Sequence, residues 1–477
     1  MEEASVSIRL NPFKGLAGPE GTPVPWSPYG RMLAERPVFT LDPLFHAGCY
    51  YVQDSSAMYV GYLFRKLLDN KKDIKVLDLC AAPGGKTTDL AASLRERYGD
   101  GFTLVANEVM KARVKILDDN VARWGDPNVI VTSVDPAAFA RLGGYFDIIV
   151  ADVPCSGEGM FRKDARAREE WSPAVVDLCA SRQKRILADV WPALREGGWL
   201  LYSTCTYETA ENDDNLAWAA AELGGEILEP EAEFEEYGVR RTPHGHLLEA
   251  GIVPGEGQWA GALRKTAPQA VTPGADPAIL RPLREGIRKG ETKGRDFVPD
   301  ADYALSIIFD RDEYNCVDVD RQTALRFLHR DALVLPQAAP GYNAVTYQGH
   351  PLGFVKNIGS RCNNLLPKDR RILQVSASSA TVLSLSPPDT VMPTSLNPFI
   401  SSSQRTSSIS SLKFPLLEPG VSSLTPFRSL TALQASMAPV RSSEKVSMSI
   451  MRGTSGSMIS SNALNAASLL PIMSMRA

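Results

Sequence analysis

Five short apolar runs, each followed by a stretch with helical periodicity, constrain the fold more than any other feature of this sequence. The runs span residues 75–79, 102–106, 128–132, 146–151 and 198–203. Helical patterns follow at Thr87–Arg97, Lys111–Trp124, Pro173–Leu194 and Asn215–Leu223. Strands that alternate with helices need right-handed crossovers, and they form an open parallel sheet covered on both faces. The sequence therefore predicts an α/β fold that binds ligands at the carboxyl ends of its strands.

The segment after the first run combines small residues with a helix start. Residues 80–87 read Cys-Ala-Ala-Pro-Gly-Gly-Lys-Thr. A Walker-type loop requires glycine where Cys80 stands, and Gly84-Gly85 does not supply the GxGxxG spacing of a dinucleotide site. The glycines still allow a ligand close to the backbone, and the helix N-terminus offers free N–H groups with partial positive charge. The turn suits a carboxylate as well as a phosphate, and a tight turn without a ligand is the alternative.

Carboxylates follow the next three runs of the predicted sheet. Glu108 comes after the second run, Asp135 after the third and Asp152 after the fourth. An acidic residue placed like Glu108, about 20–25 positions after the glycine-rich turn, can hold both ribose hydroxyls of a nucleoside cofactor. Because three carboxylates would repel a pyrophosphate, the set favours a positively charged nucleoside cofactor. S-adenosylmethionine is such a cofactor, with a sulfonium and a carboxylate that the helix N-terminus can bind.

Two cysteines are placed after neighbouring strands of the predicted sheet. Cys155 follows the fourth run and Cys205 follows the fifth. A thiolate that adds to carbon 6 of a pyrimidine makes carbon 5 nucleophilic, and a base must later remove the carbon 5 proton so that the thiol can leave. Two thiols beside a methyl donor therefore favour covalent methyl transfer. The residues alone leave open which thiol attacks and which helps release the product.

Four segments, in order, are similar to one family of enzymes. They are Asp78-Leu-Cys-Ala-Ala-Pro-Gly-Gly-Lys-Thr87, Asn107-Glu108, Asp152-Val-Pro-Cys-Ser-Gly-Glu-Gly-Met-Phe-Arg162 and Tyr202-Ser-Thr-Cys-Thr-Tyr207. The set resembles the NOL/NOP/Sun family of RNA (cytosine-5) methyltransferases, and within it the bacterial RsmF type, which modifies 16S ribosomal RNA. The resemblance implies a Rossmann-like class I S-adenosylmethionine-dependent methyltransferase sheet.

The resemblance also implies roles for individual residues. Cys205 would be the nucleophile, Cys155 would release the methylated product, and Asp152 would bind the cytosine and help to protonate N3. Lys86 would position the loop and the target base. The cofactor site would be lined by Cys80, Ala81, Ala82, Pro83, Gly84, Gly85, Lys86, Glu108, Asp135 and Asp152.

The likeness extends on both sides of the catalytic segment. Residues 255–262 resemble the last strand of the family's sheet, where Gln258 and Ala260 replace the more usual aromatic pair with little expected consequence. We expect an N-terminal segment at residues 1–65, the methyltransferase domain at 66–265 and a basic linker at 266–297. A small C-terminal PUA-like α+β domain that binds RNA would follow at 298–372.

The composition changes near residue 373. Residues 373–477 contain 27 serines among 105 residues, and repeated prolines interrupt them. Such a segment cannot bury enough apolar surface to fold, so it is predicted to be a disordered tail. The whole chain has 51 Lys and Arg against 55 Asp and Glu, a net charge of -4, which excludes a uniformly basic nucleic-acid coat.

The seven cysteines show no CxxC spacing, so neither a zinc ribbon nor a disulfide framework is expected. No metal site is predicted, and the histidines His46, His244 and His246 are interpreted as structural. The absence of an apolar run of about 18 residues predicts no membrane span. These features favour a cytoplasmic protein with reduced thiols, and we expect it to be a monomer.

The predicted function is methylation of carbon 5 of a cytosine in RNA, with 16S ribosomal RNA or the small ribosomal subunit as partner. Transfer RNA is the alternative substrate. An alternative of another class is a noncatalytic RNA-binding protein of ribosome assembly, which the presence of Cys205 and the glycine-rich turn disfavours.

Overall fold

The computed structural model describes residues 6–162, 165–268 and 276–375. The tail predicted at 373–477 lies outside the described residues from position 376 onward. The described residues belong to one compact unit. Among them, no helix combines the length and apolarity that crossing a membrane requires.

The chain begins with a small antiparallel sheet that the sequence did not predict. Its strands are β1 (Val6–Leu10), β2 (Thr22–Val24), β3 (Ser27–Leu33) and β4 (Tyr50–Val52), in the order β2-β3-β1-β4. The short helix α1 (Pro43–His46) precedes β4. Strands β1 and β4 are paired so that Arg9 lies opposite Tyr51, which places both side chains on one face of this N-terminal sheet.

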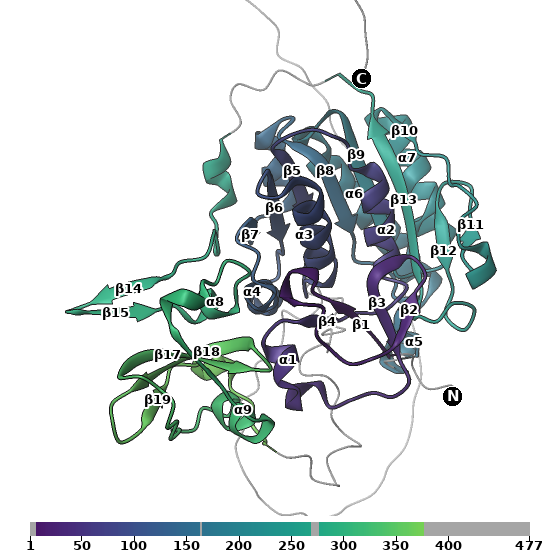
Figure 1. The fold of residues 1–477 in the computed structure, drawn as a ribbon. Coiled ribbons are helices and arrows are strands. Elements are labelled where there is room, and N and C mark those ends of the chain that lie inside the picture. The colour runs from purple at the N-terminus through teal and green to yellow at the C-terminus, as the bar shows by residue number, and fades with distance from the viewer. Residues whose placement is uncertain (1–5, 163–164, 269–275, 376–477) are drawn as a thin grey trace, which may run out of the picture. The chain divides into compact units, whose positions relative to one another are not determined.

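A nine-stranded sheet forms the centre of the molecule (Figure 1). Its order is β11-β12-β13-β9-β8-β5-β6-β7, and β10 also pairs with β13. The parallel strands are β5 (Ile74–Asp78), β6 (Phe102–Asn107), β7 (Val129–Thr132), β8 (Phe146–Asp152) and β9 (Leu194–Thr204). The antiparallel strands are β10 (Gly225–Ile227), β11 (Arg240–Arg241), β12 (His246–Leu248) and β13 (Gln258–Lys265).

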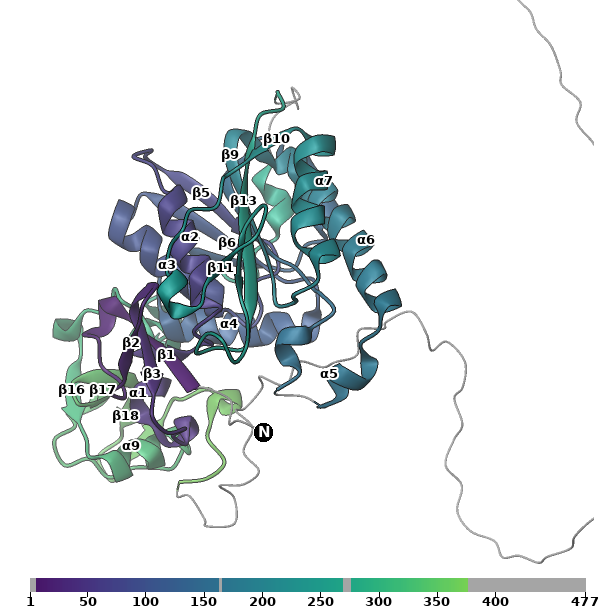
Figure 2. The ribbon, with the colours of Figure 1, turned by 90° about the vertical axis from the view of Figure 1, so that its right-hand side faces the viewer.

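Helices cover both faces of this sheet (Figures 1 and 2). One core packs Val76 and Val150 against α2 (Met58–Leu67), α3 (Gly85–Tyr98) and α4 (Lys111–Trp124). The other packs the alternate residues Leu77 and Ile149 against α6 (Pro173–Val190) and α7 (Asp213–Leu223). Successive strand residues point to opposite faces, so a strand buried on both sides reads as a continuous apolar run. The predicted α/β fold is confirmed.

Two features of the central sheet differ from the prediction. The sheet is mixed, because β13 runs antiparallel to β9, pairing Trp259 with Thr204, and β12 pairs with the other edge of β13. The helix predicted to reach Leu194 ends at Val190, and β9 already begins at Leu194. Pro192 explains the early end, because a proline lacks the N–H that continues a helix.

A small α+β domain follows the central sheet. Its elements are α8 (Ala301–Leu305), β16 (Asn315–Asp318), α9 (Arg321–Leu328), β17 (Gly341–Tyr347), β18 (His350–Asn357) and β19 (Cys362–Asn364). Its strands form a sheet in the order β16-β17-β18-β19. At the end of the range predicted as a linker, β14 (Gly290–Lys293) pairs with β15 (Asp296–Pro299) in a hairpin that extends two residues into the next predicted range. A further short helix, α5 (Ala165–Glu170), lies before α6.

Candidate active site

The glycine-rich loop, residues 80–86, leaves β5 and enters α3. Four consecutive carbonyl oxygens of this loop accept hydrogen bonds from groups around it: Ala82 from Arg113 (2.6 Å), Pro83 from Asn120 (2.8 Å), Gly84 from the Thr88 N–H (2.9 Å) and Gly85 from Arg9 (3.1 Å). Because the carbonyl and N–H of a trans peptide unit point in opposite directions, the bonds to Pro83, Gly84 and Gly85 also orient the N–H groups of Gly84, Gly85 and Lys86. The carbonyls face the surrounding chain, so the N–H groups can serve a ligand.

Gly84 gives the loop its shape. Its φ of 109° lies in the left-handed region, which glycine adopts without the penalty that other residues meet. Gly84 is the N-cap residue of α3, a helix of 14 residues. The first N–H groups of such a helix have no partner within it and carry partial positive charge, so they attract a carboxylate or phosphate. This geometry agrees with the anion site expected from the sequence.

Two buried carboxylates near this loop have oxygens that accept no hydrogen bond from the described residues. Asp78, the last residue of β5, accepts one from the Thr87 hydroxyl (2.6 Å) through Oδ2, but its Oδ1 accepts none. Glu108, just after β6, accepts the Met110 N–H (2.9 Å) through Oε1, but not through Oε2. Unsatisfied buried oxygens are costly, and they fit a ligand with hydroxyl or ammonium groups. The sequence interpretation missed Asp78 as a site residue, although it lies in the motif quoted for the resemblance.

Arg113 approaches the second oxygen of Glu108 without donating a hydrogen bond to it. The Arg113 Nη1 and Glu108 Oε2 are 3.3 Å apart, which is an ion pair by distance but lacks hydrogen-bond geometry. The same guanidinium donates to the Ala82 carbonyl, so it connects Glu108 to the glycine-rich loop. Glu108 thus has a fixed orientation and one acceptor oxygen left for a ligand.

The remaining predicted cofactor residues differ in exposure. Ala81 and Ala82 are buried, and Cys80 is half-buried. Burial raises the pKa of the Cys80 thiol, and Glu108 raises it further, so this thiol stays neutral. Asp135 is exposed and accepts the Ala137 N–H (3.0 Å), which caps a short 3-10 helix. This capping hydrogen bond gives Asp135 a structural role that requires no ligand.

The two cysteines singled out by the sequence are in contact. The Sγ atoms of Cys155 and Cys205 are 3.2 Å apart. Strands β8 and β9 bring them together, because Asp152 lies opposite Ser203 in the parallel pair and both chains then leave the sheet. Cys155 is buried and Cys205 is partly exposed, so Cys205 is the thiol that a substrate can reach more easily.

The contact makes the two thiols unequal. The hydrogen bond from Cys155 lowers the pKa of Cys205, against the effect of burial, and Lys86 lowers it further. The same hydrogen bond raises the pKa of Cys155, and burial raises it again. Cys205 is therefore the thiol that ionises first, and a thiolate rather than a thiol is the nucleophile.

Asp152 joins the thiols to the glycine-rich loop. Its Oδ2 accepts a hydrogen bond from Lys86 Nζ (2.8 Å), and its Oδ1 accepts one from the Ser203 hydroxyl (2.8 Å). Although burial opposes it, Asp152 raises the pKa of Lys86, so the ammonium stays charged. The structure thus brings Lys86, Asp152, Cys155 and Cys205 together.

Gln258, one of the two departures from the family pattern, also contacts Asp152. Its Nε2 donates to Asp152 Oδ1 (3.2 Å) and to the Thr204 carbonyl (2.8 Å). Gln258 begins β13, which lies beside β9, and its side chain is buried. No local pattern in the sequence indicates this contact, because it depends on the antiparallel pairing of β13 with β9.

Two further carboxylates fix the backbone around the thiols. Glu158 accepts hydrogen bonds from the Thr206 hydroxyl (2.8 Å) and the Tyr207 N–H (2.7 Å). Glu211 accepts from the Ser156 N–H (3.1 Å) and from Gln183 (2.7 Å). Both hold the segments that carry the cysteines, and the sequence interpretation named neither.

The described residues contain no group of three or more His, Cys, Asp or Glu side chains that could hold a metal ion. The rings of His46 and His246 instead contact backbone carbonyls, those of Thr40 (3.0 Å) and Glu231 (2.8 Å). For these two histidines the contacts agree with the structural role expected from the sequence.

Three family models match the chain. They are 16S rRNA methyltransferase RsmB/F over residues 65–231, the N-terminal domain of 16S rRNA methyltransferase RsmF over residues 1–55, and the methyltransferase RsmF PUA domain over residues 314–372.

Curated relatives match most of the described chain. Ribosomal RNA small subunit methyltransferase F of Klebsiella pneumoniae (strain 342) is 31% identical over 433 residues, with 76% of this chain and 88% of the relative covered. The protein of the same name from Escherichia coli O157:H7 (strain EC4115 / EHEC) is 32% identical over 440 residues, covering 76% and 89%.

Solved structures also align with the chain. A methyltransferase homolog protein from Pyrococcus horikoshii is 28% identical, with a TM-score of 0.45 and coverage of 55% of this chain and 87% of that one. NSun6 from Pyrococcus horikoshii, solved with SFG, is 23% identical, with a TM-score of 0.41 and coverage of 49% and 57%.

Proposed function

This chain belongs to the RsmF family of 16S rRNA methyltransferases, and from that premise we propose that it methylates carbon 5 of a cytosine in 16S ribosomal RNA through a covalent bond between Cys205 and carbon 6. Membership makes the protein an S-adenosylmethionine-dependent RNA methyltransferase. The contact between the Cys155 and Cys205 thiols, 3.2 Å apart at the carboxyl end of the sheet, is the observation that carries the covalent mechanism.

The residues at the end of β5 and β6 fit the cofactor. The N-terminus of α3 suits its carboxylate, and the free oxygen of Glu108 suits the ribose hydroxyls. The free Oδ1 of Asp78 suits a positive group. When bound, S-adenosylmethionine supplies the methyl group. We place it on Asp78 and on the predicted set of residues 80–86, Glu108, Asp135 and Asp152.

Cys205 begins the reaction in this proposal. Its thiolate adds to carbon 6 of the cytosine, and the electron pair of the 5,6 double bond makes carbon 5 a nucleophile. Carbon 5 then takes up the methyl group while it still holds its proton. Lys86 supports the first step because its ammonium lowers the pKa of Cys205.

Cys155 completes the reaction. It removes the proton from carbon 5, the double bond forms again, and the Cys205 thiolate leaves carbon 6. In the free enzyme the hydrogen bond and the charge of Cys205 raise the pKa of Cys155. A Cys205 sulfur bonded to carbon 6 carries no charge, so both causes disappear and Cys155 ionises more readily at the stage that needs a base.

Asp152 holds the target base in this proposal. Its side chain is 28% exposed, and its fixed hydrogen bonds to Lys86 and Ser203 determine the direction of the carboxylate. We propose that it binds the cytosine and helps to protonate N3, which draws electrons from the ring and makes carbon 6 easier to attack. Lys86 then positions both the loop and the base.

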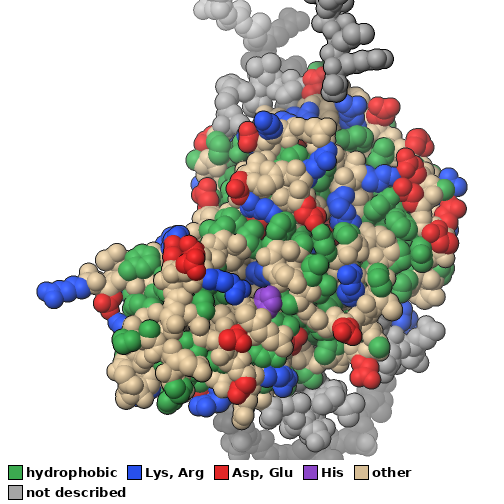
Figure 3. Space-filling view, viewed as in Figure 1, with side chains coloured by type: hydrophobic (Ala, Val, Ile, Leu, Met, Phe, Trp, Pro, Cys, Tyr) green, Lys and Arg blue, Asp and Glu red, His purple; other side chains and the backbone are tan. Residues whose placement is uncertain are grey.

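The C-terminal domain provides the support for RNA as the substrate. We propose that residues 66–265 perform the chemistry and that residues 298–372 bind RNA, as the match to a PUA domain suggests. Basic and acidic side chains are interspersed over the face in Figure 3, and basic side chains stand at the end of the β14–β15 hairpin. Such a surface favours a structured RNA recognised by shape over strong nonspecific binding.

Bisulfite sequencing separates this function from the alternatives. Ribosomal and transfer RNA from a deletion strain should show one 16S cytosine that is no longer protected, and the wild-type gene should restore it. A lost site in transfer RNA would favour the alternative substrate. Unchanged RNA together with a defect in subunit assembly would favour a noncatalytic role. The monomeric state and the cytoplasmic location stay predictions.

Two variants test the assignment of the thiols. Cys205→Ala should abolish methyl transfer and leave cofactor binding intact. Cys155→Ala should accumulate a covalent protein–RNA adduct, visible as a slow band on a denaturing gel, because elimination stalls after methylation. Cys316→Ala, which changes an exposed thiol of β16, is the matched control and should methylate normally. An adduct with Cys205→Ala and none with Cys155→Ala would reverse the roles.

A further inference from the structure

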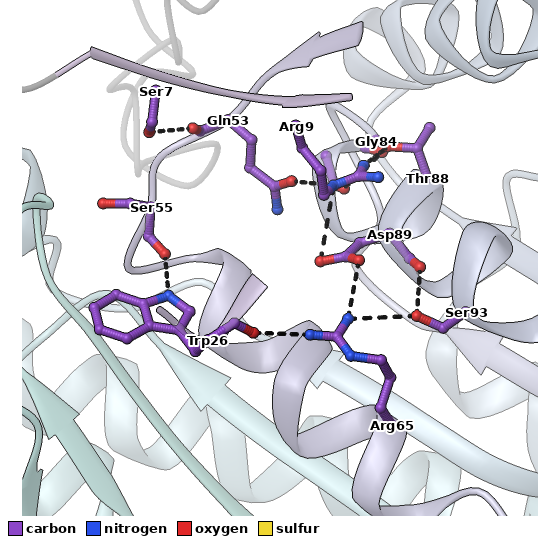
Figure 4. A network of polar contacts seen from close by, with 11 residues as sticks. Ser7, Arg9, Trp26, Gln53, Ser55, Arg65, Gly84, Thr88, Asp89 and Ser93 are labelled. Carbon is purple, nitrogen blue, oxygen red and sulfur yellow. Dashed lines mark hydrogen bonds and ion pairs between the residues drawn. The ribbon is translucent and has the colours of Figure 1, made fainter. Parts of the chain in front are cut away.

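Arg9 connects the N-terminal sheet to the glycine-rich loop. Its guanidinium is fully buried and lies over the Trp124 ring at 4.6 Å. It donates hydrogen bonds to Gln53 Oε1 (2.8 Å), the Gly85 carbonyl (3.1 Å) and the Thr88 hydroxyl (2.5 Å) (Figure 4). Two of these three acceptors belong to the first turn of α3, where the loop ends.

The bond to Gly85 fixes more than one carbonyl. The Gly85 carbonyl and the Lys86 N–H belong to one planar trans peptide unit and point in opposite directions. Because Arg9 binds the Gly85 carbonyl from the side of the N-terminal sheet, the Lys86 N–H points away from that sheet. Lys86 also begins the side chain that reaches Asp152. The orientation of this peptide unit thus affects both the anion site and the Lys86–Asp152 pair.

A second residue of the N-terminal sheet supports the same loop. Tyr51 lies opposite Arg9 in the β1–β4 pair, and its hydroxyl donates to the Pro83 carbonyl (3.3 Å). A methyl group on Gly85 would approach the Tyr51 ring at 3.2 Å, so the sheet packs closely against the loop. Two adjacent side chains of one sheet face therefore hold two carbonyls of the loop.

Stability alone does not account for Arg9. Burial lowers its pKa, so the charged form is held at a cost, and Asp89 offsets that cost at a distance of 3.8 Å from Nε. Its Nη1 has no hydrogen-bond partner within the described residues. A buried charge with an unsatisfied donor is a poor source of stability compared with an apolar side chain of similar size.

We propose that Arg9 is a positioning residue for the cofactor, and that the N-terminal sheet completes the S-adenosylmethionine site. This inference rests on the placement of the cofactor at the glycine-rich loop. The Gly85 carbonyl also accepts a hydrogen bond from the Thr88 hydroxyl (3.0 Å), and that hydroxyl accepts one from Arg9. Loss of Arg9 therefore removes one donor to this carbonyl and the group that orients the other, so the peptide unit is held less firmly and the loop binds the cofactor less tightly.

Arg65 provides a matched control within the same network. It also pairs with Asp89, at 3.4 Å, and is drawn beside it in Figure 4. Arg65 also donates to the Trp26 carbonyl (2.9 Å) and to the Ser93 hydroxyl (3.5 Å). Ser93 lies further along α3, away from the loop. Arg9 joins the N-terminal sheet to α3, and Arg65 joins α2 to α3. Of the two, only Arg9 contacts the glycine-rich loop.

The test uses the full chain with Arg9→Lys and Arg65→Lys. Calorimetric titration with S-adenosylmethionine should give about tenfold weaker binding for Arg9→Lys and a change of less than about twofold for Arg65→Lys. In steady-state assays Arg9→Lys should raise the KM for the cofactor with little change in kcat at saturation. RNA affinity should stay the same. Equal cofactor affinities of the two variants, after matching for melting temperature, would overturn the proposal.

Two additional variants keep the test decisive. Thr88→Val removes the hydroxyl that accepts from Arg9 and lies within hydrogen-bond distance of the Gly84 (2.9 Å) and Gly85 (3.0 Å) carbonyls. It should weaken cofactor binding in the same direction, and it serves if Arg9→Lys does not fold. Glu108→Ala, measured in parallel, separates the two proposals. If Glu108→Ala weakens cofactor binding and neither Arg9→Lys nor Thr88→Val does, the role of Arg9 is wrong and the cofactor site stands. If none of the three matters, the placement of the cofactor itself is wrong.

Discussion

Glu108 has one carboxylate oxygen in use and one that accepts no hydrogen bond from the described residues. Hydrogen bonds from ribose hydroxyls to a carboxylate are worth about 1.5–3 kcal/mol each. Glu108→Ala should therefore weaken S-adenosylmethionine binding by at least about tenfold, since each decade of affinity is about 1.4 kcal/mol. Calorimetric titration with the cofactor measures this loss.

Glu108→Gln is the control for that variant, because it keeps an acceptor for the Met110 N–H and removes the charge. It should fall between the wild type and Glu108→Ala. A filter-binding assay should show unchanged RNA affinity for both. Unchanged cofactor affinity in Glu108→Ala would mean that Glu108 is only a strand-end residue, and would weaken the cofactor site as drawn.

Asp78 should make stability depend on pH. Burial raises its pKa to about 7 from an ordinary value of 3.8, with the Thr87 hydrogen bond acting in the opposite direction. The folded protein thus holds this proton more tightly than the unfolded chain. The stabilisation is complete below about pH 3.8, decreases as the pH rises, and is lost above about pH 7.

Asp78→Asn removes this dependence and keeps an oxygen for the Thr87 hydroxyl. Without cofactor, the unfolding free energy of the wild type should fall relative to that of the variant between about pH 4 and 7, by at most about 1.4 kcal/mol per pH unit. The melting temperature should fall with it. Thermal melts across this range measure the difference. Parallel curves would show that Asp78 titrates normally.

Site residues that the sequence could not reveal reach the site through tertiary contacts. Cys155, Cys205, Asp152 and Glu108 follow strands, so the strand pattern alone placed them at one edge. Gln258 reaches Asp152 only because β13 returns beside β9, and no local pattern encodes that pairing.

The loop between β5 and α3 depends on glycine at position 84. Gly84 has φ 109°, and a Cβ there would lie 3.2 Å from Leu117 Cδ1. The left-handed region costs other residues about 1–2 kcal/mol. Gly84→Ala should shift the loop and weaken cofactor binding by about tenfold, a change that corresponds to about 1.4 kcal/mol.

Gly99 ends the same helix and supplies the comparison. It also has a positive φ, 59°, and a Cβ there would meet nothing within 4 Å. Both Gly84→Ala and Gly99→Ala should lower the melting temperature by a few degrees, but Gly99→Ala should leave the cofactor affinity unchanged. If both variants bind the cofactor equally well, the shape of the loop does not set affinity.

The elements that the sequence predicted correctly are the long, strongly patterned ones. Strands β5 to β8 and helices α3 and α4 lie within a few residues of their expected positions, because buried strands are apolar runs and these helices have clear ends. Strands β2 and β4 have three residues each, too few for a period to show. The N-terminal sheet was therefore missed, and with it the contacts of Arg9 and Tyr51.

Parts of the chain that are far apart in the sequence are in contact. Residues of the N-terminal sheet such as Ile8 and residues of the C-terminal domain such as Phe327 belong to the same apolar cluster. Leu283 and Arg284, in the range expected to be a linker, bind the backbone of Val131 at the edge of β7. The sequence predicts these parts as separate segments, because contacts between distant segments leave no local pattern.

A cluster of two arginines and three aspartates joins α4 to the C-terminal domain. Asp302 of α8 pairs with Arg284 (2.8 Å) and with Arg370. The two arginines also reach α4, where Arg284 pairs with Asp118 (2.5 Å) and Arg370 with Asp119 (3.3 Å). Asp302 is 18% exposed, so the cluster is mostly shielded from water. Although burial opposes it, Arg370 and Arg284 lower the pKa of Asp302.

Asp302→Asn should destabilise the whole molecule, because it leaves two guanidiniums near each other without the carboxylate between them. Breaking a buried pair costs about 3–5 kcal/mol, and the partial exposure puts the expected loss near the lower end.

The effect of Asp302 should depend on pH. A carboxylate with a lowered pKa stabilises the fold above its ordinary pKa of 3.8 and loses that effect as the pH falls further. The melting-temperature gap between wild type and variant should thus be largest near neutral pH and close in acid. Asp296→Asn, which breaks the exposed pair with Lys356, should leave the melting temperature nearly unchanged, because water and salt screen exposed ion pairs. Equal losses in the two variants would show that the cluster around Asp302 does not hold the C-terminal domain against α4.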